Sequence, residues 1–362
     1  MRTALHMRTA LGLVVVLLGA ACAERAIVAV LPPPEVSNVR DVWVVKLRGD
    51  AQATRRTAPP RTNRLSFERT SVSIPPTHQP GQIKWPKGPP DANTDFVITQ
   101  EVKFSTESQF VNALNAGQAA EQGETLLFVH GYNVRHYEAV YQLAQMAEDY
   151  DVSGPAVVFS WPSAGVAAGY VYDRDSVLIS RDALEQTIIA LSKQSNREII
   201  LVGHSMGSHL IMETLRQIEI KKSLDIATSI TALVLMAPDI DGEVFLSQVR
   251  SLDALPDPSI LMVAQRDRAL RLSAFLAGQR PRLGGQTDRA IVADLPISVI
   301  DVDDLGTGER FDHAIPTSSP AAIEILRRLD ADMPIANAEI PDLVVLSELP
   351  HTPNPTKTQP DR

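Results

Sequence analysis

The sequence predicts an α/β protein built on a mostly parallel, doubly wound sheet with helices on both faces. The main observation is an alternation along the chain, in which short apolar runs of strand length are separated by segments with helical spacing. The apolar runs cover residues 125–129, 156–160, 199–202, 232–236, 260–264 and 297–300. Runs that are apolar throughout are typical of parallel strands covered on both faces. In such a sheet, the active site lies at the carboxyl ends of the strands.

Helices are expected between and around these runs. The segments with helical spacing cover residues 108–122, 136–149, 176–194, 206–219, 242–252 and 268–276, and a last one follows at 320–331. Residues 96–104 alternate between apolar and polar side chains, as a half-buried edge strand does. The ordered domain is therefore predicted to span residues 95–332.

The first 23 residues have the features of an export signal. Arg2 and Arg8 form a positive region, residues 11–18 an apolar core, and small residues follow. The apolar core is too short to span a bilayer. Cys22 follows it as in a bacterial lipoprotein, where this cysteine is lipidated, but residues 21–23 equally fit ordinary signal peptidase. We therefore predict export, either to the periplasm or to a lipid anchor on the cell envelope, with a cytoplasmic location as the third alternative.

The segments on either side of the predicted domain are rich in proline. Residues 24–94 contain proline runs at 32–34 and 59–60 and one apolar run, at 42–47, that could form an isolated strand. Proline runs favour extended, poorly packed backbone. We expect a tether and an irregular segment here, and a disordered tail at 333–362.

Composition excludes several classes of function. The chain of 362 residues carries a formal charge of −9, so it lacks the basic surface that binds nucleic acid. We expect membrane contact only through an N-terminal lipid anchor. With Cys22 as the single cysteine, an intramolecular disulfide is excluded. No ligand spacing for a metal and no phosphate-binding glycine loop is recognisable, so we expect neither a metal nor a cofactor.

A Gly-x-Ser-x-Gly motif separates the predicted strand at 199–202 from the helix at 206–219. It reads Gly203-His204-Ser205-Met206-Gly207. A strand turning sharply into a helix is the context that a nucleophile elbow requires. Ser205 is then the candidate nucleophile, and the amide of Met206 points at the oxyanion that forms on attack. A structural turn is the alternative interpretation of the motif.

A second candidate element follows the strand at 125–129. The segment His130-Gly131-Tyr132-Asn133 ends at the same edge of the sheet as Ser205. We predict that the amide of Tyr132 faces that of Met206 and completes an oxyanion hole. His130 is a candidate for substrate contact, or it only bonds to backbone in this loop.

A serine nucleophile at such an elbow works with an acid and a histidine, and the three form a catalytic triad. Because the chain order in these sites is Ser, then acid, then His, the order predicts the other two members. His313 follows the last strand and precedes the final helix, so it is the candidate general base. Asp267 follows the preceding strand, at 260–264, and is the candidate acid. Asp239, with Asp241 nearby, follows the strand at 232–236 and is the alternative acid. Asp267 could equally be the centre of a surface salt bridge, because arginines flank it.

Two further residues are weighed as substrate contacts. Trp161 and Arg174 follow the strand at 156–160, where they could border an acyl pocket and meet an anionic group. The alternative is a packing corner in which Arg174 pairs with Asp173 or Asp175.

These motifs together resemble a bacterial α/β-hydrolase family of esterase/lipase-like proteins of unknown function. The matching segments are 129–133, 159–163, 172–175, 203–207, 237–241, 266–270 and 281–284, and the resemblance covers about residues 95–330. It implies the α/β-hydrolase fold and a triad of Ser205, Asp267 and His313, but no substrate. One departure is Ala314-Ile315-Pro316, where an aromatic residue is expected after the histidine.

The sequence thus predicts a serine hydrolase that cleaves a small-molecule carboxylic ester. A non-catalytic envelope protein that uses a hydrolase fold for binding is one alternative, because the proline-rich arm and anchor are interaction features. An amidase or peptidase with the same triad is the other.

Overall fold

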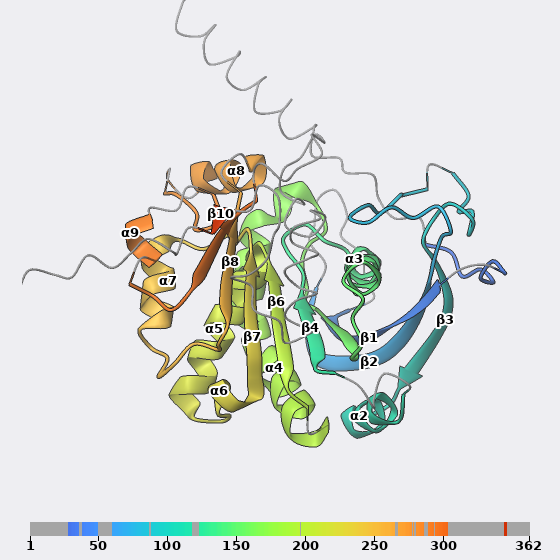
Figure 1. The fold of residues 1–362 in the computed structure, drawn as a ribbon, viewed down its shortest axis with the longest axis horizontal. Helices are drawn as coiled ribbons and strands as arrows, with labels where there is room; N and C mark the ends of the chain where they lie inside the picture. Colours follow the sequence, from blue (N-terminus) through green and yellow to red (C-terminus); the bar gives the residue numbers. More distant parts are fainter. Residues whose placement is uncertain are drawn as a thin grey trace, which may run out of the picture.

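The computed structural model describes residues 28–35, 38–49, 60–86, 88–117, 123–195, 197–264, 267–276, 278, 280–285, 289–292, 294–302 and 344–345. The predicted export signal with Cys22, the base His313 and the helix expected at 320–331 lie outside these residues. The described strands form one sheet of ten, with the order β10-β9-β8-β7-β6-β4-β5-β1-β2-β3 (Figure 1).

The six predicted apolar runs are the central strands of this sheet. They are β4 (Thr125–Val129), β5 (Ala156–Ser160), β6 (Ile199–His204), β7 (Ile230–Met236), β8 (Ser259–Val263) and β9 (Ser298–Asp301). Neighbours among them pair in parallel. The predicted fold class is confirmed. After β5 the chain returns to the far side of β4 to form β6, so the strand order reverses between β4 and β6. Ligand sites in such sheets lie at that reversal, beyond the carboxyl ends of the strands.

The N-terminal part of the chain extends the same sheet. β1 (Asn38–Arg48) pairs in parallel with β5, and β2 (Arg61–Ile74) and β3 (Val97–Phe104) follow as antiparallel strands. The expectation of an irregular segment with an isolated strand at 42–47 is therefore wrong for the residues of β1 and β2. The apolar side chains of β1 face the cores on both sides of the sheet, and the proline runs lie outside both strands.

Helices cover both faces of the sheet. They are α2 (Glu107–Ala116), α3 (His136–Asp149), α4 (Tyr170–Ile189), α5 (Met206–Lys221), α6 (Ile226–Ser229), α7 (Gly242–Val249), α8 (Arg268–Leu276) and α9 (Arg289–Val292). α3 packs in the core with Leu126 and Phe128, whereas α4, α5 and α7 pack in the other core with Leu127 and Val129. The side chains of β4 thus alternate between two cores, as a covered strand requires.

Several element boundaries differ from the prediction. α4 begins at Tyr170, six residues early, after a 3-10 turn at Ala167–Gly169, and it continues into a π-helical segment at Ala190–Gln194. Residues 344–345, in the predicted tail, form β10 and pair with β9. None of the helices within the described ranges combines the length and apolar character that crossing a bilayer would require.

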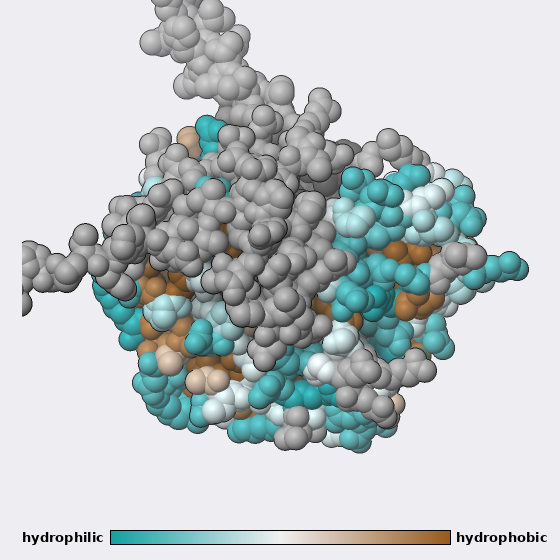
Figure 2. Space-filling model, viewed as in Figure 1, coloured by the Kyte–Doolittle hydropathy of each residue, from teal (hydrophilic) through white to brown (hydrophobic). Residues whose placement is uncertain are grey.

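Where Figure 2 colours the surface by hydropathy, hydrophilic side chains predominate on the side shown. Hydrophilic side chains gather along the rim of that face, and hydrophobic ones show in separate patches between them. A polar surface with separate apolar patches is usual for a globular protein. The formal charge of the whole chain is −9.

Candidate active site

Ser205 occupies a strained turn between β6 and α5. Its backbone has φ of 53° and ψ of −117°, a combination that costs a non-glycine residue on the order of 1–3 kcal/mol. Gly207 permits the turn, because a β-carbon there would lie 2.2 Å from the carbonyl oxygen of Val129. Gly203 does the same on the strand side, where a β-carbon would lie 2.8 Å from Cα of Ser208. The local geometry is that of the predicted nucleophile elbow.

The loop that follows β4 lies against this turn. A β-carbon on Gly131 would come within 3.1 Å of Cβ of Ser205 and 3.0 Å of Nδ1 of His204. Tyr132, whose amide we predicted to line the oxyanion hole, is the next residue. The hydroxyl of Tyr132 donates to the carbonyl of Ala167, which ties the loop to the start of α4. The structure therefore brings the two predicted elements of the oxyanion hole together, while the role of each amide stays a prediction.

His130 and Trp161 support this loop from inside the protein. Their rings stack with centroids 5.2 Å apart and an interplanar angle of 11°, and Trp161 Nε1 donates to the His130 carbonyl at 2.7 Å. Both side chains are fully buried. The stack and the hydrogen bond hold the two residues against each other inside the protein, and a contact of either ring with substrate stays a prediction.

Asp173 ties the segment after β5 to the loop after β4. Its carboxylate accepts hydrogen bonds from the hydroxyl of Ser163 at 2.7 Å, the amide of Ala164 at 2.6 Å and the amide of Asn133 at 3.1 Å. Asn133 has a φ of 61°, so this bond holds a left-handed residue in place. The packing corner proposed as the alternative interpretation is present, but the hydrogen bonds of Asp173 hold it together and not an ion pair of Arg174. Arg174 is exposed and forms no ion pair among the described residues.

Asp267 follows β8, two strands from β6, and its side chain is fully buried. One carboxylate oxygen accepts hydrogen bonds from the amides of Ala269 and Leu270, at 2.8 and 3.0 Å, in the first turn of α8. These bonds fix the carboxylate at the carboxyl edge of the sheet. The alternative interpretation, an exposed salt-bridge centre, does not fit a fully buried side chain. Since His313 lies outside the described residues, the triad role of Asp267 stays a prediction.

Asp239, the alternative acid, belongs to a buried polar cluster. Its carboxylate lies 3.1 Å from Nε of Arg282, and it accepts hydrogen bonds from the hydroxyls of Ser273 and Tyr170. The side chains of Asp239 and Arg282 are only 3% and 4% exposed. Both carboxylate oxygens of Asp239 are therefore bonded within this cluster. Removing one partner of the ion pair would leave a buried charge unpaired, which would be costly. The amide of Asp239 also donates to the carbonyl of Ser205 at 3.2 Å, which braces the elbow.

Tyr170 and Asp241 are two further polar residues whose roles the structure indicates. Burial, and then the charge of Asp239, raise the pKa of Tyr170 to about 12, so its hydroxyl stays protonated. Asp241 caps α7 by accepting hydrogen bonds from the amides of Glu243 and Val244. Asp241 is therefore a helix cap and not a second candidate acid.

A serine–histidine–glutamate chain that the sequence reasoning missed lies at the same edge of the sheet. Nδ1 of His136, the first residue of α3, is 3.1 Å from Oγ of Ser160, and Nε2 is 2.7 Å from Oε1 of Glu68. Ser160 is fully buried, and Glu68 and His136 are 6% and 9% exposed. Glu68 was missed because it lies on β2, in the segment expected to be irregular.

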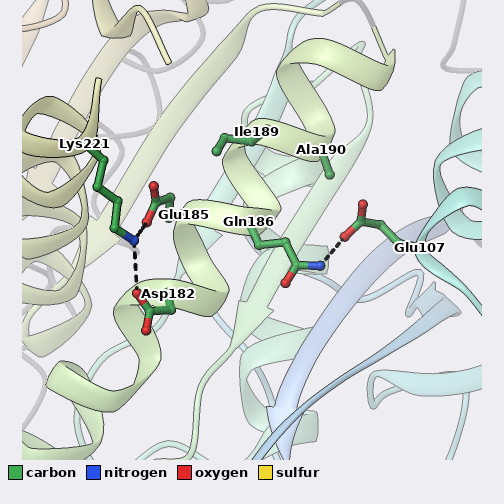
Figure 3. Close-up of a pocket in the computed structure, with 7 residues that line it drawn as sticks. All are labelled: Glu107, Asp182, Glu185, Gln186, Ile189, Ala190 and Lys221. Atoms are coloured by element: carbon green, nitrogen blue, oxygen red, sulfur yellow. Dashed lines mark hydrogen bonds and ion pairs between the residues drawn. The ribbon is translucent and has the colours of Figure 1, made fainter. Parts of the chain in front are cut away.

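The hollow drawn in Figure 3 is remote from this site. It has a volume of about 440 Å³ and lies where α4 meets the end of α5 and the start of α2. Lys221 lines it and contacts Glu185 and Asp182. Because Lys221 stands 16 residues after Ser205 on α5, it lies about 24 Å along the helix from the elbow. Within the described ranges no group of three potential ligands could hold a metal ion.

The parallel sheet, the elbow after β6 and the loop beside it define an α/β hydrolase. Residues 103–329 match the family described as alpha/beta hydrolase of unknown function (DUF900). This match covers more than half of the chain, so the protein belongs to that family. The expected resemblance to such a family is confirmed. No match is found among curated proteins.

Solved structures with a similar chain course include several hydrolases. The thermostable carboxylesterase EstE1 from a metagenomic library is 13% identical, with 87% of this chain and 91% of that chain covered and a TM-score of 0.36. Dienelactone hydrolase from Anabaena variabilis is 12% identical over 74% and 92% of the two chains, with a TM-score of 0.36. The RedJ thioesterase of Streptomyces coelicolor is 15% identical over 60% and 93%, with a TM-score of 0.35.

Proposed function

We propose that this protein is a serine hydrolase that cleaves carboxylic esters through an acyl-enzyme formed on Ser205. The observation that carries the proposal is the strained backbone of Ser205 at the turn between β6 and α5. Strain of this kind persists only where the surrounding structure imposes it, and it is typical of functional sites. Here it is imposed by close backbone approaches at Gly203 and Gly207, and it sets the serine at the N-terminus of a 16-residue helix.

The proposed reaction has two halves. Oγ of Ser205 attacks the ester carbonyl carbon while His313 accepts the hydroxyl proton, and Asp267 stabilises the resulting imidazolium. The amides of Met206 and Tyr132 donate hydrogen bonds to the oxyanion. The intermediate then collapses, the bond to the alcohol oxygen breaks, and the alcohol leaves with the proton from His313. A water molecule, deprotonated by His313, attacks the acyl carbon. The bond to Oγ of Ser205 then breaks, Oγ takes the proton back from His313, and the carboxylic acid is released.

The direct test is hydrolysis of 4-nitrophenyl butyrate by the purified protein and by Ser205→Ala. We expect a rapid first release of 4-nitrophenol equal to the enzyme concentration, because 4-nitrophenol leaves during acylation and, with so good a leaving group, deacylation is the slower step. The variant should show no such burst while keeping its circular dichroism spectrum and melting temperature. A folded Ser205→Ala protein with unchanged turnover would contradict the proposal and favour the non-catalytic binding function.

The same triad could cleave amides, and a matched substrate separates the two reactions. Butyryl 4-nitroanilide has the same acyl group as the ester and a poorer leaving group. We expect the ester to be cleaved with the higher kcat/KM. A higher kcat/KM for the anilide would instead identify an amidase or peptidase.

We also propose that the chain is exported and that Cys22 decides between a lipid anchor and a free periplasmic protein. The support is the order of charged, apolar and small residues in the first 23 positions. Metabolic labelling with palmitate distinguishes the two. Label on the wild type and none on Cys22→Ala supports the anchor, whereas an unlabelled periplasmic protein supports ordinary signal cleavage. Unprocessed protein in the cytoplasm would contradict export.

A further inference from the structure

The loop after β4 has an unusual backbone conformation that a contact from outside the loop stabilises. Asn133, directly after the proposed oxyanion donor Tyr132, has a φ of 61°. Residues other than glycine rarely adopt this left-handed conformation, although asparagine tolerates it better than most. The amide of Asn133 donates a hydrogen bond to Oδ2 of Asp173 at 3.1 Å. A side chain of α4 therefore holds the left-handed residue of this loop.

This hydrogen bond lies one residue away from the proposed oxyanion donor. The amide of Asn133 belongs to the planar peptide unit that follows Tyr132, and the amide of Tyr132 belongs to the unit that precedes it. Only the two backbone dihedral angles of Tyr132 lie between the two N–H groups. Fixing the second peptide unit therefore restricts the direction in which the Tyr132 amide points.

The carboxylate of Asp173 is itself held in place on both of its oxygens. The side chain is fully buried in the first turn of α4. Oδ1 accepts a hydrogen bond from the amide of Ala164 at 2.6 Å. Oδ2 accepts one from the hydroxyl of Ser163 at 2.7 Å, in addition to the one from Asn133. Hydrogen bonds to a charged acceptor are stronger than those between neutral groups, so Asp173 is a firm attachment point for the loop.

The loop is also in contact with both the elbow and the start of α4. A β-carbon on Gly131 would lie 3.1 Å from Cβ of Ser205. The ring of Tyr132 meets that of Tyr170 edge to face, with centroids 5.5 Å apart. The hydroxyl of Tyr132 donates to the carbonyl of Ala167. These contacts place the loop beside the proposed nucleophile, and the bond to Asp173 fixes its backbone there.

We propose that Asp173 is a positioning residue for the proposed hydrolysis, because its carboxylate holds the loop after β4 in the conformation that aims the Tyr132 amide at the oxyanion. Negative charge develops on the carbonyl oxygen of the ester only when Oγ of Ser205 attacks. A displaced donor therefore costs rate and not substrate affinity. A purely structural role of Asp173 would affect stability alone. This inference rests on the proposed hydrolase function and adds the group that orients one oxyanion donor.

The direct test is Asp173→Asn, studied by stopped-flow with 4-nitrophenyl butyrate. The new NH2 group faces N–H donors and cannot accept from them, so the bond to Asn133 is lost or loses its charged acceptor. We expect the rate constant of acylation to fall about tenfold to a hundredfold, as displacement of a catalytic donor does. The Kd of the ester before acylation should change by less than about twofold. An unchanged acylation rate constant in the folded variant would overturn the positioning role.

Inhibition by 1,1,1-trifluoro-2-pentanone tests the oxyanion itself. Oγ of Ser205 adds to the carbonyl carbon of the ketone, the hydroxyl proton passes to His313, and the carbonyl oxygen becomes an oxyanion bound by the proposed donors. In Asp173→Asn the inhibition constant should rise by about the factor by which the acylation rate constant falls. Slower acylation with an unchanged inhibition constant would contradict the positioning role.

Asp149→Asn is the matched control for loss of a buried carboxylate. Asp149, the last residue of α3, is 3% exposed and accepts a hydrogen bond from the loop amide of Gly81 at 2.6 Å. It lies about 20 Å along the helix from the end of α3 at the carboxyl edge of the sheet. This variant should lose stability in urea but keep the acylation rate and the inhibition constant within about twofold of wild type. Equal losses in both variants would overturn a specific role of Asp173.

Two variants at Asn133 examine the same bond from the loop and give a result whether or not Asp173→Asn folds. Glycine adopts a φ of 61° freely, whereas alanine is disfavoured there, and both lack the asparagine side chain. We expect acylation to be about fivefold slower in Asn133→Ala than in Asn133→Gly, from the cost of the left-handed conformation. Equal rate constants overturn the positioning role. Wild-type protein that neither releases 4-nitrophenol nor binds the ketone would instead overturn the hydrolase function.

Discussion

Two serines lie at the carboxyl edge of the sheet, and their surroundings differ in kind. Ser160 ends β5 in ordinary strand conformation and lies in a chain with His136 and Glu68 at 3.1 and 2.7 Å. Ser205 follows β6 with a strained backbone and begins a helix. Both serines are buried, with 0% of Ser160 and 2% of Ser205 exposed. Ser160 has the polar partners of a triad, whereas Ser205 has the turn, the helix and the adjacent loop. Under the proposed mechanism, the nucleophile is the serine with the strained strand-to-helix turn and not the one with triad-like hydrogen-bond partners.

The largest expected effect is the contrast between Ser205→Ala and Ser160→Ala. Removing the nucleophile of a serine hydrolase lowers kcat by a factor on the order of 10⁶. Removing the Ser160 hydroxyl should change kcat by less than about threefold and act on stability instead, because it leaves Nδ1 of His136 without this partner. Turnover of 4-nitrophenyl butyrate measures both, and comparable losses in the two variants would break the comparison.

A second prediction concerns the backbone that shapes the elbow. A methyl group in Gly207→Ala would meet the carbonyl oxygen of Val129 at 2.2 Å, so β4 and α5 must move apart. We expect the free energy of unfolding to fall by about 3 kcal/mol, together with loss of turnover. Gly88→Ala is the control, because a β-carbon there meets nothing within 4 Å. Urea denaturation of the two variants gives the comparison, and equal stabilities would contradict a close-packed elbow.

The third prediction tests the role of the buried chain at Ser160. Replacing Glu68 by Gln should lower stability at pH 7 by about 1–3 kcal/mol, because His136 loses a charged partner. Although burial alone would raise the pKa of Glu68, the hydrogen bond and charge of His136 bring it below its ordinary value of 4.5. A depressed carboxyl pKa stabilises the fold above the unfolded value, and this stabilisation is lost as the pH falls through the folded value.

The stability difference between wild type and Glu68→Gln should therefore shrink as the pH falls below 4.5. Melting temperatures measured between pH 3 and pH 7 give this difference. A gap that stays the same down to pH 3 would show that the ionised carboxylate does not contribute. Turnover at pH 7 should remain close to wild type, because the proposed reaction does not use Ser160, His136 or Glu68.

The smallest expected effect is on the pH dependence of catalysis. Activity should decline below about pH 6–7 as the general base becomes protonated. In His136→Gln the midpoint of this decline should shift by less than about 0.3 units, because His136 is bonded to Glu68 and Ser160 and the proposed mechanism gives it no role. A profile of kcat/KM against pH shows this. A midpoint that moves with His136 would place the wrong histidine in the mechanism.

The central strands were predictable because their side chains are apolar on both faces. The run at 125–129 matches β4 residue for residue, and 156–160 matches β5. β2 was not predictable in the same way. The first half of the strand carries exposed polar side chains, and the strand is stabilised by pairing with β1 and β3. Such pairing partners lie far apart in the sequence, so local pattern does not reveal them.

The residues of the candidate site also differ in whether a local sequence pattern predicts them. Ser205 and the loop at 130–133 were found because short motifs follow recognisable strands. The cluster of Asp239, Tyr170, Ser273 and Arg282 joins residues separated by up to 112 positions, and only the folded chain brings them together. Arg174 was considered as a substrate contact from its sequence context, whereas Asp173 was considered only as its ion-pair partner.

The most direct measurement of the central claim is covalent labelling of the folded protein with a fluorophosphonate, followed by mass spectrometry of its peptides. The account predicts a single modified residue, Ser205, with no labelling of Ser205→Ala and full labelling of Ser160→Ala. A protein that stays unlabelled, or that carries the label on Ser160, would contradict it.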